Sequence, residues 1–158
     1  MWDGNVVDRA IKTTTSEWKR ALDPSIESHL HGNKYDPLIR RILVDGINQA
    51  WGEEIESWIK CPPVSGGSSD QTVLQQASDT DDGTVCPLAW AKPINHLNCE
   101  WVWPKKFDEP PYNKPQGPPL ELDTDEYSGR ITQGWVVEKL LAQAGLRLAS
   151  ILNLIFAP

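Results

Sequence analysis

The chain has little positive charge and no long hydrophobic run. Acidic side chains outnumber basic ones by 22 to 15 among 158 residues, giving a formal net charge of −7. Proteins that hold nucleic acid by a basic surface need clustered Lys and Arg, so the charge argues against that mode of binding. No apolar run is expected to span a membrane. The N-terminal residues Met-Trp-Asp-Gly-Asn lack the basic and apolar regions of a signal peptide.

The short motifs of several enzyme classes are missing too. The sequence has no Gly-rich phosphate loop, no Gly-x-Ser-x-Gly elbow and no Cys/His nucleophile pair. Its three cysteines, Cys61, Cys86 and Cys99, lack the Cys-x-x-Cys spacing of a structural zinc site. Cys61 and Cys86 flank a stretch rich in Ser, Gly and Asp, so we predict that they pair under oxidising conditions. Cys99 is then free, or paired outside this chain.

What the sequence does contain is helical periodicity. Apolar residues recur three and four apart towards the C-terminus, which predicts one long amphipathic helix over Thr132–Phe156. Asp123 and Glu126 are expected to cap its start, and Glu138 to lie on its solvent face. The apolar stripe is formed by Val137, Leu140, Leu141, Ala144, Leu148, Ile151, Leu152 and Ile155.

Three further helices are expected upstream. One covers Trp2–Ile11, one begins at Asp36-Pro37 and runs to Ile59 with a weak point at Asp45-Gly46, and one begins at Pro87. Trp101-Val-Trp103 is expected to be extended. Residues 62–85 predict a mobile Ser/Asp-rich loop and residues 104–122 a Pro-rich loop. With no convincing alternating strand, the fold class is all-α.

Few side chains stand out as candidates for chemistry. His29 and His31 lie close together but have no third ligand nearby, so we interpret them as surface histidines. Three glutamates, Glu53, Glu54 and Glu56, are typical of a solvated helix face. Taken alone, the residues therefore indicate a helical domain without an identifiable reaction.

Three motifs, taken in order, resemble one family. They are Trp2-Asp3 opening a helix, Trp90-Ala91 followed eight residues on by Cys99, and Gly145-Leu-Arg-Leu-Ala149 followed by Leu152-Asn153. Together they resemble the C-terminal half of the zinc-dependent, single-strand-specific nucleases of fungi and plants (nuclease S-one/P-one). That family shares its helical fold with bacterial phospholipase C. The resemblance runs from Trp2 to Phe156.

The resemblance implies a chemistry that residue patterns alone do not. The family uses three zinc ions to hydrolyse phosphodiesters of RNA and single-stranded DNA, often with 3′-nucleotidase activity. Metal charge in place of a basic patch reconciles an acidic protein with a polyanionic substrate. Trp2-Asp3 matches the end of a family metal-binding motif, so Asp3 is the metal-ligand candidate. Asn5 is a weaker candidate for holding the base, and Cys99 resembles a family cysteine whose partner lies in the other half.

The remaining family ligands would lie before Met1. We therefore expect residues 1–158 to be the C-terminal portion of a single nuclease domain, inactive without its N-terminal half. By resemblance the protein is secreted and its partners are nucleic acid or nucleotides, not a membrane. The alternative is a non-catalytic helical binding or scaffold protein that reuses the nuclease helices.

Overall fold

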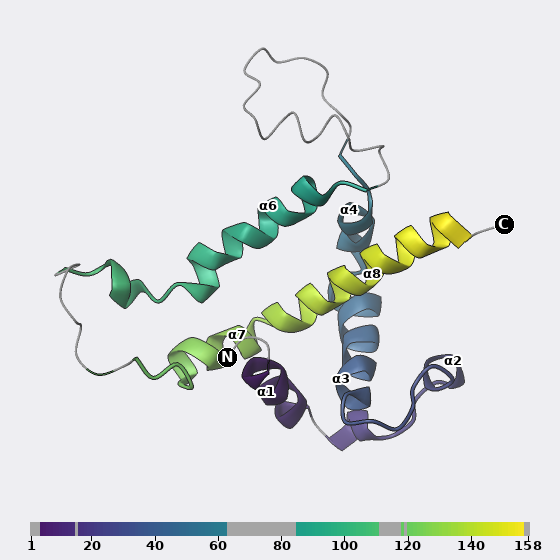
Figure 1. Cartoon of the computed structure of the whole chain (residues 1–158). Helices are drawn as coiled ribbons and strands as arrows, with labels where there is room; N and C mark the ends of the chain where they lie inside the picture. Colours follow the sequence, from purple (N-terminus) through teal and green to yellow (C-terminus); the bar gives the residue numbers. More distant parts are fainter. Residues whose placement is uncertain (1–3, 15, 63–84, 111–117, 119, 157–158) are drawn as a thin grey trace, which may run out of the picture. The chain divides into compact units, whose positions relative to one another are not determined.

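The computed structural model describes residues 4–14, 16–62, 85–110, 118 and 120–156. Within these residues every regular element is helical, which confirms the all-α prediction (Figure 1). The narrower assignment to the phospholipase C-like fold stays a prediction. In chain order the elements are α1 (Asn5–Thr13), η1 (Ser16–Lys19), α2 (Pro24–Glu27), α3 (Asp36–Arg41), η2 (Ile42–Ala50), η3 (Gly52–Glu54), α4 (Ile55–Ile59), α6 (Pro87–Leu97), η5 (Asn98–Val102), η6 (Lys105–Asp108), η7 (Asp125–Gly129), α7 (Arg130–Gln133) and α8 (Val136–Phe156).

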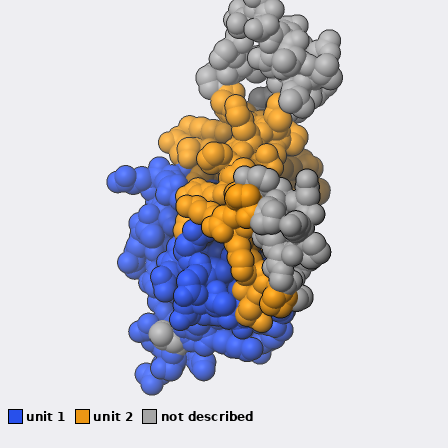
Figure 2. Space-filling model, turned by 90° about the vertical axis from the view of Figure 1, so that its left-hand side faces the viewer, with its two compact units in different colours: residues 1–55, 122–146 blue, residues 56–121, 147–158 orange. Residues whose placement is uncertain are grey.

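Two compact units divide the chain, coloured separately in Figure 2. Unit 1 comprises residues 1–55 and 122–146, and unit 2 comprises residues 56–121 and 147–158. Among the described residues unit 2 buries only Trp58 and Cys86 as hydrophobic side chains, so the hydrophobic core lies in unit 1. The buried hydrophobic residues of unit 1 are Val6, Ala10, Trp18, Leu38, Ile42, Trp51, Ile131, Val136, Val137 and Ala142.

The helix predicted to begin at Asp36 consists of α3 followed directly by η2, whose turns are wider than those of an α-helix. The backbone angles at the junction of the two elements are helical. Pro37 occupies the first turn of α3, but Asp36 is not its cap. Its Oδ2 instead accepts hydrogen bonds from the backbone N–H groups of Gly32 and Asn33, at 2.7 and 3.1 Å. Gly46, the predicted weak point, lies inside η2 and against the Trp51 ring. The predicted continuous helix instead changes course at Trp51, whose φ is −118° and ψ 6°, and resumes as η3 and α4.

The predicted C-terminal helix is interrupted. Trp135 has a φ of +52°, a left-handed conformation that breaks the path between α7 and α8. The predicted cap is also displaced: the Thr124 side chain accepts from the Tyr127 N–H and begins η7 rather than α8. The assignment of Glu138 to the solvent face is wrong, since only 1% of this residue is exposed. Val137 of the predicted stripe is buried as expected, and burial in the first turn of α8 extends to Val136 and Glu138 on either side of it.

Unit 2 departs from expectation at its aromatic segment. Trp101 and Val102 belong to the helical element η5, not to an extended strand. The helix predicted to begin at Pro87 is α6, and it continues through Pro93 to Leu97. Of the predicted Pro-rich loop, Lys105–Asp108 forms η6, while residues 111–117 and 119 lie outside the described residues. The predicted Ser/Asp-rich loop also falls outside them, from 63 to 84.

The apolar stripe of α8 is only partly covered within the described residues. Leu141, Leu148 and Leu152 are 46%, 57% and 43% exposed, and Leu140 is half-buried. The expectation that no segment is long and apolar enough to cross a membrane is wrong by length and composition. Val136–Phe156 reaches a mean hydropathy of 1.3 over an 18-residue window. A mostly buried core helix of a soluble protein meets the same criterion, but only 6% of this window is buried.

Candidate functional site

Of the two residues predicted to bind metal or base, the structure describes one, at the start of α1. Asn5 is the first residue of α1 and is exposed, whereas Asp3 lies outside the described residues. Gly4 is the N-cap residue and makes no side-chain cap, and a Cβ built there would meet no atom within 4 Å. Space is therefore open around the first turn of α1 on the described side.

Arg9 holds α1 within unit 1. One guanidinium nitrogen, Nη1, donates to Asp123 at 2.6 Å and to the Ser128 hydroxyl at 2.9 Å, and Nη2 donates to Asp125 at 3.2 Å. The two carboxylates are largely exposed, so each ion pair contributes at most about 1 kcal/mol. The convergence of three acceptors on one planar group nevertheless fixes the orientation of α1 against η7.

The apolar side of α1 completes this anchoring. Val6 and Ala10 are 2% and 1% exposed, and α1 contacts both α3 and α7. The Thr14 hydroxyl donates to the Ala10 carbonyl at 2.8 Å and closes the helix end. The first turn of α1, with Asn5, is therefore presented from a helix held on two sides.

A second cluster surrounds the left-handed Trp135. The Arg41 guanidinium carbon lies 4.0 Å from the centroid of the Trp135 ring, and Trp51 meets the same ring edge-on at 5.8 Å. These contacts stabilise a backbone conformation that costs on the order of 1–3 kcal/mol for a residue other than glycine. Strained backbone of this kind is common at functional sites and at places where helices must change direction.

Glu138 lies one helical turn beyond this break. Its Oε1 has no hydrogen-bond partner among the described atoms and is buried. Burial raises the pKa of the Glu138 carboxyl above its ordinary value of 4.5, and the nearby positive charge of Arg41 opposes that rise. A carboxyl that is protonated over a wider pH range can stay buried at lower cost than a carboxylate.

The remaining candidates do not assemble into a metal centre. His29 and His31 are exposed, as are Glu53, Glu54 and Glu56. Within the described ranges no three His, Cys, Asp or Glu side chains come close enough to hold a metal ion. Glu54 instead receives a hydrogen bond from Lys139 at 2.8 Å. The described part of the chain therefore does not by itself fit a zinc site.

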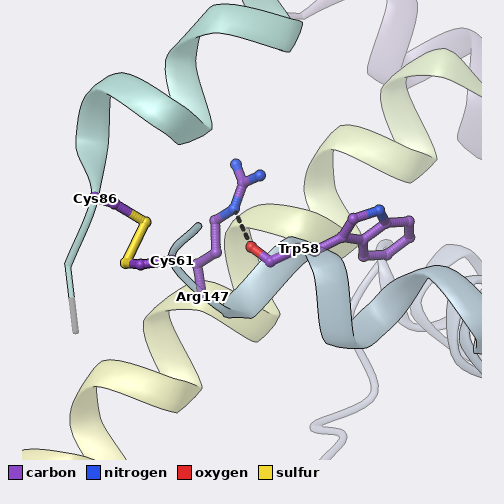
Figure 3. The surroundings of a disulfide bond; sticks show 4 residues. All are labelled: Trp58, Cys61, Cys86 and Arg147. Atoms are coloured by element: carbon purple, nitrogen blue, oxygen red, sulfur yellow. Dashed lines mark hydrogen bonds between the residues drawn. A yellow bond between two sulfur atoms is a disulfide. The ribbon is translucent and has the colours of Figure 1, made fainter. Parts of the chain in front are cut away.

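In unit 2 the cysteines follow the prediction. Cys61 and Cys86 form a disulfide with 5.6 Å between their Cα atoms (Figure 3). Cys99 is free and exposed. Beside the disulfide, Nε of Arg147 donates to the Trp58 carbonyl at 2.9 Å. The same guanidinium lies 5.3 Å from the Trp90 ring centroid. Arg147 thus joins α8 to both segments that the disulfide links.

Comparison with known proteins adds one finding. Endonuclease 4 of Arabidopsis thaliana is 25% identical to this chain over 157 residues, which are 99% of the chain and 36% of the relative. The chain therefore spans about a third of the length of that relative. No protein-family model matches, and no solved structure matches. The similarity is to a nuclease, over the whole of both units.

Sequence reasoning missed the Trp135 cluster and the burial of Glu138. The sequence did contain a signal for a break before α8: Gly134 precedes Trp135, and glycine disfavours the helical conformation. Nothing in the periodicity identified Trp135 as the left-handed residue, however, since that conformation is rare in bulky side chains.

Proposed function

We propose that this chain is the helical portion of a zinc-dependent endonuclease that hydrolyses phosphodiester bonds of RNA and single-stranded DNA. The observation that carries the proposal is the similarity to Endonuclease 4 along 99% of the chain. An all-α fold agrees with it. The acidic composition agrees as well, because metal ions rather than Lys and Arg would neutralise the phosphates.

The metal site itself would be completed by residues outside this chain. Asp3 is the one ligand candidate, and the described residues supply no further cluster. Zinc would supply a hydroxide nucleophile near neutral pH when bound. The chain's own contribution is positional: Arg9 and the buried face of α1 fix the helix that follows Asp3, and they present Asn5 for contact with a base.

A secreted location belongs to the same proposal. Structural disulfides persist in oxidising compartments and are rare in the cytosol. The Cys61–Cys86 disulfide is consistent with secretion. Cys99, free and exposed here, would find its partner in the remaining part of a complete nuclease domain.

A chimera tests the proposal. In it, this chain replaces the aligned segment of Endonuclease 4, and hydrolysis of single-stranded DNA is measured with added zinc and with chelator. We expect zinc-dependent hydrolysis by the chimera and none by the isolated chain. The Asp3→Ala chimera should lose at least a hundredfold in rate with unchanged helix content, because a metal ligand is removed.

The matched control is Asp8→Ala, a change to an α1 acid that points to Lys34 at 3.5 Å and is outside the site. It should retain activity. A well-folded chimera without any hydrolysis would contradict the proposal. It would favour the second candidate, a non-catalytic helical scaffold, for which the lack of a metal cluster among the described residues is the supporting observation.

A further inference from the structure

Three side chains of unit 1 lie together where α8 begins: Trp135, Glu138 and Arg41. Trp135 has a left-handed backbone conformation, with a φ of +52°. The guanidinium carbon of Arg41 lies 4.0 Å from the centroid of the Trp135 ring. Glu138 is buried, and its Oε1 has no hydrogen-bond partner among the described atoms. A carboxyl oxygen without a donor and a cation held on a ring therefore belong to the same small region.

The first turn of α8 brings Glu138 beside Trp135. The Lys139 N–H donates to the Trp135 carbonyl at 2.9 Å, so residues 135–139 form one helical turn. Side chains three residues apart on a helix are neighbours, and the charge of Arg41 acts on the Glu138 carboxyl. Arg41 therefore has two alternative partners within electrostatic reach, the face of an indole ring and a carboxyl oxygen.

The other cations of the surrounding elements are already engaged. Lys139 donates to both carboxylate oxygens of Glu54 in η3, at 2.9 and 2.8 Å. Arg40 of α3 donates to both carboxylate oxygens of Glu27, each at 2.7 Å. The remaining ionisable groups of α3, η2 and η3 are carboxyl groups, which when ionised cannot donate to a carboxylate: Asp36, Asp45 and Glu53. Arg41 is therefore the cation that these three elements offer to the buried carboxyl.

We propose that Glu138, Arg41 and Trp135 form a proton-operated switch at the break between α7 and α8. While Glu138 is protonated, its carboxyl is neutral and Arg41 rests on the Trp135 ring, which is the arrangement described above. When Glu138 releases its proton to solvent, Arg41 turns from the ring and donates to the carboxylate. The exchange is favourable because a buried carboxylate without a donor costs more than the loss of a cation–π contact.

Release of the ring removes one support of the left-handed backbone at Trp135. That conformation is costly for a residue other than glycine, and the edge contact with Trp51 is left to maintain it. The break between α7 and α8 should therefore relax once Arg41 has turned away. Because α7 contacts α1, the helix that follows Asp3, ionisation of one buried carboxyl should change the positions of α7 and α1 relative to the first turn of α8.

Nuclear magnetic resonance of the ¹⁵N-labelled chain tests the switch. The indole N–H of Trp135 and the Nε–H of Arg41 are assigned and followed from about pH 4 to pH 8. Burial raises the pKa of the Glu138 carboxyl above 4.5, so both resonances should shift with one common midpoint above pH 4.5. Backbone amides of α7 should shift with the same midpoint. Glu138→Gln cannot ionise and should abolish all of these shifts.

A second variant separates the switch from a merely structural role of Glu138. Arg41→Gln removes the cation that stabilises the carboxylate, so the midpoint of the Glu138 side-chain carboxyl resonance should rise by about one pH unit or more. Trp135 should then no longer respond at that midpoint. Lys139→Gln is the matched control, because it removes an adjacent cation that Glu54 holds, and it should leave the titration of Trp135 unchanged.

Two results would overturn the proposal. One is a Trp135 indole resonance that does not move between about pH 4 and pH 8 in the parent, or that moves equally in Glu138→Gln. The other is a Glu138 midpoint that is the same in Arg41→Gln as in the parent, since Arg41 would then not be the partner of the carboxylate.

Discussion

Glu138 is the residue whose environment departs most from what its type suggests. Its carboxyl is 1% exposed, and burial raises its pKa in the folded protein. The unfolded chain releases this proton at the ordinary pKa of 4.5. Stability from the protonated form is therefore fully present below that pH and is lost as pH rises through the folded pKa.

We expect Glu138→Gln to remove this dependence. An amide cannot ionise, so the variant should gain in free energy of unfolding relative to the parent as pH rises above 4.5, and should match it below. Urea denaturation between pH 4 and 8 measures the difference. Glu126→Gln, exposed in η7, is the control and should leave the profile unchanged. If the free energy of unfolding changed with pH in the same way for Glu138→Gln and the parent, the Glu138 carboxyl would not have a raised pKa in the folded protein.

Two glycines in helical segments should respond in opposite directions to the same substitution. A Cβ at Gly46 would overlap the Trp51 ring, whereas one at Gly145 meets nothing. Gly46→Ala should cost about 1–3 kcal/mol by overpacking. Gly145→Ala should stabilise α8 by about 0.5–1 kcal/mol through helix propensity. Thermal and urea unfolding of both variants checks the signs, and equal losses would contradict the packing argument at Gly46.

At the scale of elements, apolar periodicity sustained over many residues predicted the helices most reliably. The apolar spacing predicted α8, and the Asp36-Pro37 pair predicted the start of α3. The disulfide was predicted because Cys61 and Cys86 flank a stretch rich in Ser, Gly and Asp. Boundaries failed where tertiary contacts override local preference. Trp135 is left-handed because Arg41 and Trp51 stabilise its ring, and such partners are distant in sequence. Both site residues, Asp3 and Asn5, came from the resemblance and not from the residue pattern. Asp3 lies outside the described residues, Asn5 is exposed at the start of α1, and both roles stay predictions.

The disulfide is the element that should matter most to unit 2. It closes a loop with a sequence separation of 25 residues, worth about 3.5 kcal/mol in the chain-entropy model. We expect the Cys61→Ser, Cys86→Ser double variant to lose roughly 2–4 kcal/mol of unfolding free energy, measured by urea denaturation without reductant. Cys99→Ser changes an exposed free thiol and should cost less than about 0.5 kcal/mol. A larger loss for Cys99→Ser would show that Cys99, not the observed pair, carries the crosslink.

For the whole molecule, burial is distributed unequally. Nearly all buried apolar side chains among the described residues belong to unit 1, and unit 2 relies on Trp58, the disulfide and the Arg147 contacts. Segments with few buried apolar contacts open at lower free energy than core segments. The two units therefore should not unfold as one cooperative body.

Hydrogen exchange followed by mass spectrometry measures this difference. Amides of α6 should exchange at least tenfold faster than those of α3 and η2. The reason is that α6 has no buried residue, whereas α3 buries Leu38 and η2 buries Ile42. Replacing both Cys61 and Cys86 by Ser should speed exchange in α6 further and leave α3 unchanged, since the disulfide constrains unit 2 alone. The Arg9→Ala variant gives the reciprocal control: it should raise exchange in α1, which loses its contacts to Asp123 and Ser128, and leave α6 as it was. Equal protection of α3 and α6, rising and falling together in all variants, would show that the two units share one folding transition.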